Sequence, residues 1–273
     1  MTIPFHDQDH ARLWARRGFV IVPMLGDEDV SRLRAASTPT DDIVRFPFSA
    51  TIMSRDVDDR LRISRELQAL LQPKIDAIVD GYRVCFGNYT FKPAAQTGGG
   101  VELHQDWSFV DEALGEPLGL WCPLVPVTPE NGCLFVVPGS HRLTRHPRSV
   151  HARFHHPEID SVLDRVLTPL AMRAGDAVLF SQRLFHTSPP NRSDRARPVA
   201  CAVLAPRSSP CRCYYPDPAN AGDLLVFEVD DDFYTRYRIG NRPDGEPVGT
   251  VRVAPERLSA EDLLHAVREA DGP

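Results

Sequence analysis

A short His-x-Asp pattern lies near the middle of the chain and is the sequence's best candidate for chemistry. In Leu103-His104-Gln105-Asp106-Trp107, one residue separates an imidazole from a carboxylate. Alternate side chains of a strand share a face, so we expect His104 and Asp106 to point the same way. An imidazole and a carboxylate are two of the three ligands in the facial triad that holds non-haem iron(II). In a chain with ten histidines the pattern needs support from other residues.

His186 is the best candidate for the third ligand. It follows the apolar run Ala177-Val178-Leu179-Phe180, which a Gly175-Asp176 turn introduces. By strand alternation, His186 and Ser188 share a face. A second imidazole on a neighbouring strand would complete a set of two histidines and one carboxylate, with positions left open for other ligands.

Arg197 lies eleven positions beyond His186, at the start of another apolar run. A guanidinium presents its N–H groups in a planar fork that matches a carboxylate. We therefore expect Arg197 to hold one end of a dicarboxylate. An open metal beside an anchored dicarboxylate is the chemistry of an oxygenase that uses iron and 2-oxoglutarate.

The segment from Tyr82 to Ala205 has the pattern expected of an antiparallel barrel or jelly roll. Short apolar runs alternate there with Gly, Pro and Asn breaks. The expected strands are Val84–Phe91, Val101–Phe109, Gly119–Leu124, Cys133–Val137, Ala177–Phe180 and Pro198–Leu204. The predicted fold is therefore mainly β.

Helices are expected on both sides of this segment. Gly18 ends the first, Asp27 caps the second, Pro73 kinks or splits the third, and Ser259 caps the last. The expected helices are 9–17, 27–36, 65–80 and 258–269, with a strand at 19–22. We expect one domain over 1–273, with a helical flank at 1–81, a β core at about 82–205 and an extension at 206–273.

Several motifs, in order, resemble the phytanoyl-CoA dioxygenase family. The resemblance covers roughly residues 13 to 205, and no family pattern is evident beyond Arg207. The motifs are Arg17-Gly18-Phe19-Val20-Ile21-Val22-Pro23, His104-Gln105-Asp106, Trp121 through Leu124, Glu130-Asn131-Gly132-Cys133-Leu134, Val137-Pro138-Gly139-Ser140-His141-Arg142, and His186-x-Ser188 followed by Arg197.

The resemblance implies a double-stranded β-helix, a cupin-like jelly roll, with flanking α-helices. Iron(II) would sit on His104, Asp106 and His186, while Arg197 and Ser188 would bind the distal carboxylate of 2-oxoglutarate. Dioxygen would be the other co-substrate. The implied activity is oxidation of a small organic substrate: hydroxylation first, with desaturation, cyclisation or epimerisation as variants.

The resemblance also places Gln105 and Trp121 at the co-substrate pocket, although strand alternation turns Gln105 away from the iron. Two other hypotheses stay open. One is a cupin-type metal isomerase that does not use 2-oxoglutarate, against which Arg197 argues. The other is a non-catalytic binding protein on the same barrel, against which the complete ligand set argues.

Two further clusters have a plain and a functional interpretation. The stretch 141–165 is rich in Arg and His. It is either a solvated loop or a patch at the mouth of the site for an anionic substrate, a CoA phosphate or a carrier protein. Cys211 and Cys213 are either buried structural thiols or part of a soft-metal site.

Composition restricts the class of protein. The net charge is −6, so we expect no general attraction to nucleic acid or to anionic membranes. No apolar run approaches the roughly 18 residues of a membrane span, and residues 1–10 do not resemble a secretory signal. The six cysteines form no CxxC pair. These features predict a cytoplasmic protein with reduced thiols. The abundance of Arg, Ala, Pro and Asp suggests a GC-rich bacterial gene and a role in secondary metabolism.

Overall fold

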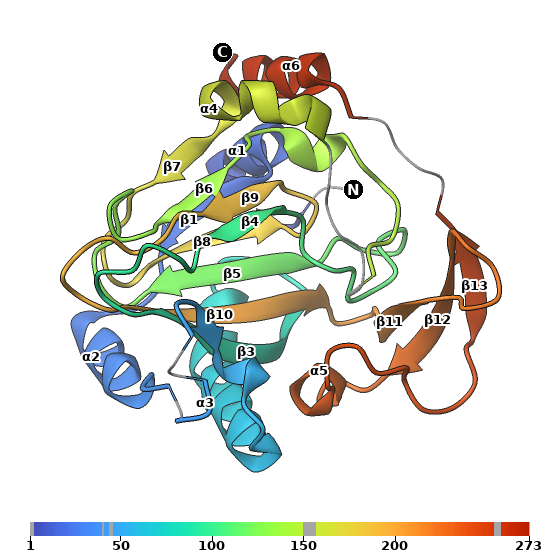
Figure 1. Cartoon of the computed structure of the whole chain (residues 1–273), viewed down its shortest axis with the longest axis horizontal. Helices are drawn as coiled ribbons and strands as arrows, with labels where there is room; N and C mark the ends of the chain where they lie inside the picture. Colours follow the sequence, from blue (N-terminus) through green and yellow to red (C-terminus); the bar gives the residue numbers. More distant parts are fainter. Residues whose placement is uncertain (1–2, 40, 44–45, 150–156, 254–257, 273) are drawn as a thin grey trace.

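The computed structural model describes residues 3–39, 41–43, 46–149, 157–253 and 258–272. Its centre consists of two antiparallel sheets that face each other (Figure 1). The larger sheet has the order β1 (Phe19–Pro23), β8 (Asp176–Ser181), β5 (Leu118–Pro123), β10 (Arg197–Pro206), β3 (Tyr82–Lys92), β2 (Ser49–Ala50). The smaller has the order β4 (Val101–His104), β9 (His186–Ser188), β6 (Leu134–Val136), β7 (Thr168–Leu170). The predicted jelly roll is confirmed.

The larger sheet is buried on both faces, which explains its continuous apolar runs. Every residue of β5 is buried. Leu120 and Cys122 face the helical layer, whereas Trp121 between them faces the smaller sheet. Because strand side chains alternate, one strand serves two cores.

The helix α3 (Val57–Asp76) covers the outer face of the larger sheet (Figure 1), with Leu67, Leu71 and Ile75 fully buried against it. The predicted helix at 65–80 was wrong at both ends. The helix begins earlier because the side chain of Asp56 caps it by accepting from Asp59 N. Pro73 lies inside the helix and does not end it.

The other N-terminal elements agree more closely with those predicted from the sequence. The helix α1 (Gln8–Arg17) ends at Gly18, which has a left-handed backbone (φ 79°). The helix α2 (Asp27–Ala36) begins at Asp27, but its N-cap is Gly26 rather than Asp27. The N-terminal segment is more than a helical flank, because β1 and β2 extend the larger sheet to β8 on one side and β3 on the other.

The residues after β10 form a separate small sheet (Figure 1), with the order β11 (Cys211–Pro216), β12 (Asp223–Val229), β13 (Gly249–Arg252). The short helix α5 (Phe233–Arg236) follows β12 and contacts α3. The last helix, α6 (Ala260–Asp271), begins with a capping box on Ser259, as predicted. It lies against α1 and α4 (Leu163–Val166).

The remaining elements are short 3-10 helices, η1 (Thr51–Met53), η2 (Ser140–Arg142) and η3 (Pro157–Val162). Within the described ranges, the structure contains no helix with the length and apolar character that crossing a membrane requires.

Candidate metal and co-substrate site

His104 and His186 face each other across the β4–β9 pair, with ring centroids 4.2 Å apart. His104 Nδ1 donates to Glu102 O (2.8 Å), and His186 Nδ1 donates to Leu184 O (2.9 Å). Each hydrogen bond holds the proton on Nδ1 and leaves the lone pair of Nε2 for a metal. The two histidines are therefore oriented as ligands by their own backbone.

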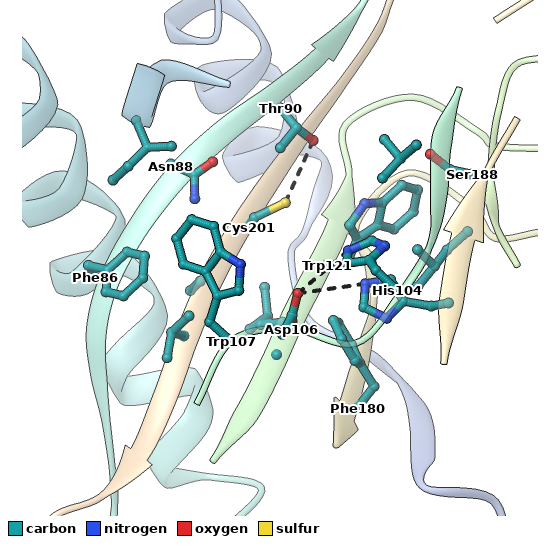
Figure 2. Close-up of a pocket in the computed structure, with 18 of the residues that line it drawn as sticks. Phe86, Asn88, Thr90, His104, Asp106, Trp107, Trp121, Phe180, Ser188 and Cys201 are labelled. Carbon is teal, nitrogen blue, oxygen red and sulfur yellow. Dashed lines mark hydrogen bonds and ion pairs between the residues drawn. The ribbon is translucent and has the colours of Figure 1, made fainter. Parts of the chain in front are cut away.

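Asp106 completes the group but does not lie in the strand. The predicted strand Val101–Phe109 was wrong beyond residue 104, since β4 ends at His104. Asp106 Oδ1 nevertheless lies 3.9 Å from His104 Nε2 and 3.7 Å from His186 Nε2 (Figure 2). Strand alternation predicted that His104 and Asp106 point the same way, but the structure brings them together by another route, because the segment after His104 curves back toward the second histidine.

The donor set fits a divalent metal. One ligand atom from each of His104, Asp106 and His186 lies within 4.8 Å of the others. Burial and, to a smaller extent, His104 lower the pKa of His186 to about 4, against an opposing effect of Asp106. The imidazole is therefore neutral at pH 7, as a ligand must be. Two neutral imidazoles and one carboxylate match the facial triad of iron(II).

Buried ion pairs hold the Asp106 segment in place of strand hydrogen bonds. Asp106 N donates to Gln182 O (3.0 Å), and Asp106 O accepts from Arg148 Nε (2.7 Å). Arg148 in turn pairs with Glu112, which also receives the Ser108 hydroxyl (2.7 Å). No pattern in the sequence indicated this role, because Arg148 stands in a stretch that resembles a solvated basic loop.

Arg197 begins β10 and is almost completely buried, with 1% of its surface exposed. No described residue accepts a hydrogen bond from its Nε or Nη1. Its guanidinium carbon lies 5.3 Å from the centroid of the Trp121 ring. Burial lowers the pKa of Arg197 to about 10, so the group stays charged at pH 7. A buried cation without a partner is costly, and it fits an anion that binds beside it.

Lys92 is a second buried cation that the sequence analysis missed. It lies opposite Arg197 in the β10–β3 pair and is 0% exposed. Its ammonium donates to Ser188 Oγ (2.7 Å), Ser188 O (3.0 Å) and Pro189 O (2.5 Å). Burial and, to a smaller extent, the charge of Arg197 lower the pKa of Lys92 to about 7. Lys92 therefore fixes the backbone and hydroxyl of Ser188 near Arg197.

Six of the seven expected site residues, Trp121 among them, line one cavity of about 330 Å³ between the two sheets. Gln105 is the exception. It is not among the described residues that line the cavity, and its amide donates to Thr144 Oγ1 (2.6 Å) and to Arg183 O. Gln105 thus braces the loop behind Asp106 instead of facing the co-substrate. This placement agrees with strand alternation, which turned Gln105 away from the iron, and not with the position that the resemblance implied.

The C-terminal extension supplies part of the cavity wall, which no sequence motif indicated. Tyr234, Tyr237 and Ile239 line the cavity together with Phe86, Trp107 and Phe109 of the central segment. The described part of the Arg/His-rich stretch 141–165 contributes no lining residue. Its residues 150–156 lie outside the described residues, so the expected patch is not tested there.

A second group with metal-ligand character joins Cys85, Cys211 and Asp231. Cys211 Sγ lies 3.9 Å from Cys85 Sγ and 3.2 Å from Asp231 Oδ1. Arg83 makes a bidentate ion pair with Asp231 (2.8 and 2.9 Å). Because a guanidinium already neutralises the carboxylate, we interpret this group as a structural contact that connects β3 to the C-terminal sheet. Cys213 is buried in the same hydrophobic cluster as Cys85 and Cys211 but is not part of this group.

The family model for phytanoyl-CoA dioxygenase (PhyH) matches residues 16–199, which include every ligand candidate. Among curated proteins, the chain is 36% identical over 120 residues to phytanoyl-CoA dioxygenase domain-containing protein 1 of Danio rerio. That alignment covers 41% of this chain and 40% of the relative, so the chain spans less than half the length of this relative.

Solved structures share the fold at low identity. The non-haem α-ketoglutarate-dependent carbocyclase SnoK from nogalamycin biosynthesis aligns with a TM-score of 0.55 at 21% identity, over 88% of this chain and 94% of its own. The epimerase SnoN, solved with Fe³⁺, α-ketoglutarate and nogalamycin RO, aligns with a TM-score of 0.55 at 20% identity, over 89% of this chain and 95% of its own.

Proposed function

Because the chain belongs to the phytanoyl-CoA dioxygenase family, we propose that it is an iron(II)- and 2-oxoglutarate-dependent oxygenase of a small organic substrate. The family uses iron(II), 2-oxoglutarate and dioxygen. The observation that carries the proposal is the buried Arg197, whose unpartnered N–H groups share a cavity with the two histidines and Asp106. A metal alone would not require this cation.

His104, Asp106 and His186 would hold the iron, and Arg197 would bind the distal carboxylate of 2-oxoglutarate. Ser188, held by Lys92, would present its hydroxyl to the same carboxylate. When bound, iron with 2-oxoglutarate and dioxygen supplies an oxidant strong enough to take a hydrogen atom from an unactivated C–H bond.

The residues around the ligands keep water from the reacting atoms. Phe180 packs edge-on against His186, with ring centroids 5.0 Å apart, and Trp121 covers Arg197. Both aromatic rings are buried and line the cavity. A dry cavity strengthens the ion pair to Arg197 and limits side reactions of the oxidant.

Hydroxylation is the outcome we propose first, with desaturation, cyclisation and epimerisation as variants of the same hydrogen abstraction. We also propose a place in bacterial secondary metabolism, which rests on the amino-acid composition. SnoK is a carbocyclase and SnoN an epimerase, so the shared fold accommodates more than one outcome.

The test is turnover of 2-oxoglutarate by the purified protein. We expect succinate to form only when iron(II) and dioxygen are both present. The Arg197→Leu variant should form succinate much more slowly at low 2-oxoglutarate. A metal isomerase would act without consuming 2-oxoglutarate, and a binding protein would consume none. Either result would replace the proposed function with one of these alternatives.

A further inference from the structure

Five aromatic side chains, Phe86, Trp107, Phe109, Tyr234 and Tyr237, form the part of the cavity that the proposed co-factors do not use; we call them the aromatic wall. They come from β3, from the segment after Asp106 and from α5 with its following residue. Phe86 stacks on Tyr234 (5.6 Å between centroids), and Phe109 meets Tyr234 edge-on (4.6 Å). Figure 2 shows Trp107 between Phe86 and Asp106, with Ser188 on the other side of Asp106.

The two tyrosines present apolar ring faces rather than hydroxyl groups to the cavity. Tyr234 OH donates to Arg212 O (2.7 Å), and Tyr237 OH donates to Asn241 O (2.6 Å). Each hydroxyl is therefore already satisfied by the backbone of the C-terminal segment. A ligand in this part of the cavity meets rings on several sides, which favours a planar or ring-bearing molecule.

Two described residues supply the formal charge of the cavity. Asp106 and Arg197 are the only Asp, Glu, Lys or Arg residues among the described lining residues. In the proposed function the first holds iron and the second holds 2-oxoglutarate. No ion-pair partner is left for a charged substrate among these residues, and a charge buried without a partner is strongly unfavourable.

Among the described lining residues, Asn88 is a polar side chain next to the aromatic wall that has a buried hydrogen-bonding atom without a partner. It lies on β3, and in Figure 2 the nitrogen end of its amide points toward Trp107. Its Oδ1 is buried without a hydrogen-bond partner among the described residues. An amide offers both a donor and an acceptor, so it can pair with a hydroxyl or a carbonyl group. An unsatisfied amide at an apolar wall is costly unless a ligand satisfies it.

We propose that the substrate is an uncharged, ring-bearing molecule with a hydroxyl or carbonyl group. Its ring lies against the aromatic wall, and its polar group pairs with the amide of Asn88. This inference rests on the proposed function, because that function assigns Asp106 and Arg197 to the metal and the co-substrate. A CoA or carrier-protein attachment would have to remain outside the cavity.

Equilibrium dialysis of three probes tests the proposal without turnover. The three probes share a ring system. 2-Naphthol adds a hydroxyl group, 2-naphthoate adds a negatively charged carboxylate, and naphthalene has no polar group. The protein is kept anaerobic with iron(II) and saturating 2-oxoglutarate. We expect 2-naphthol to bind about tenfold more tightly than naphthalene, as one added hydrogen bond allows, and 2-naphthoate to bind at least about 100-fold more weakly than 2-naphthol.

Two variants locate the contacts. Asn88→Leu should bind 2-naphthol and naphthalene equally, whereas Asn220→Leu, on an exposed turn after β11, should keep the difference. Trp107→Leu should weaken both of these probes. Affinity for 2-oxoglutarate, measured in parallel, should stay at the wild-type value in all three variants and so reports an intact site.

The wild-type comparison decides the question even if a variant fails to fold. Equal affinities for 2-naphthol and naphthalene would overturn the role of Asn88, and tight binding of 2-naphthoate in the presence of 2-oxoglutarate would overturn the uncharged class. Absence of all probe binding, with 2-oxoglutarate bound normally, would overturn the inference and leave the proposed function intact. Failure of the wild type to bind 2-oxoglutarate would instead count against the proposed function.

Discussion

Arg148 Nε donates to the backbone carbonyl of Asp106 at 2.7 Å, while the rest of its guanidinium pairs with the nearly buried Glu112. This contact explains how a carboxylate outside any strand reaches the two histidines. The segment after His104 has no ladder of strand hydrogen bonds, so a buried ion pair fixes its path. Arg148 is therefore a positioning residue for Asp106 and has no contact with the metal position.

We expect Arg148→Ala to weaken iron(II) binding and to lower the free energy of unfolding by about 3 kcal/mol, because Glu112 would lose its closest ion-pair partner and keep only Arg183 at 3.8 Å. The double variant Arg148→Met/Glu112→Leu should recover much of the stability but not the iron affinity, since the Asp106 carbonyl still lacks its donor. Urea denaturation and anaerobic iron titration measure the two effects separately.

Arg165→Ala, on the exposed side of α4, is the matched control and should change neither quantity. Wild-type iron affinity in the folded double variant would show that Arg148 has no positioning role.

Lys92 makes the stability of the metal-free protein depend on pH. Its pKa falls from 10.5 to about 7, first through burial and then through Arg197. Between these values the unfolded chain binds more protons than the folded one, so stability rises with pH, by at most about 1.4 kcal/mol per unit. Below pH 7 both states carry the proton, and Lys92 adds no further slope.

Urea denaturation of the wild type and of Lys92→Met between pH 7 and 8.5 measures this contribution. The wild type should gain stability relative to the variant across that window. Lys74→Met, a surface lysine paired with Asp29, serves as the control and should follow the wild type. Parallel pH profiles for wild type and Lys92→Met would mean that Lys92 is fully charged when folded.

Arg197→Ala should raise the 2-oxoglutarate concentration needed for half-saturation strongly, because a buried carboxylate loses its charged partner at a cost of about 2–5 kcal/mol. Arg197→Lys should recover only part of the affinity, since a lysine lacks the planar fork. Calorimetric titration with 2-oxoglutarate gives both values.

Arg195→Ala is the control, because that side chain is 89% exposed two residues away. An Arg197→Ala protein that folds and binds 2-oxoglutarate like the wild type would exclude Arg197 as the clamp.

Arg60 connects α3 to the aromatic wall. Its guanidinium donates to Ile52 O (3.1 Å), Tyr237 O (3.2 Å) and Arg236 O (3.2 Å). Arg60→Met should loosen α5 and weaken 2-naphthol binding, while 2-oxoglutarate affinity stays unchanged. Arg62→Met, on the exposed face of the same helix, should leave both affinities unchanged. Equal losses for the two ligands in Arg60→Met would indicate general unfolding instead.

The jelly roll and its ligand candidates could be predicted because they leave local patterns. Each main strand is a short apolar run between turn residues, and His104, His186 and Arg197 stand at strand ends or starts. The path of the backbone at Asp106 could not be predicted, because it depends on a hydrogen bond from Arg148, which is 42 positions away. Periodicity carries no information about such a contact.

Two other features depend on distant pairing in the same way. Lys92 is an ordinary lysine at a strand end until β10 places Arg197 opposite it. Tyr234 and Tyr237 belong to no family motif, and they enter the cavity only because the C-terminal sheet packs beside β3. For Gln105 the motif indicated a place at the co-substrate pocket, whereas strand alternation turned the side chain away. The structure agrees with the alternation, since Gln105 is not among the described residues that line the cavity.

Anaerobic absorption titration is the most direct test of the metal and co-substrate assignments. Iron(II) chelated by 2-oxoglutarate gives a visible charge-transfer band that neither component gives alone. We expect wild type and His265→Ala, a surface control on α6, to develop the band with one iron per chain. His186→Ala and His104→Ala should bind no iron at this site and give no band. A full-strength band with one iron per chain in folded His186→Ala would contradict the assignment of the ligands.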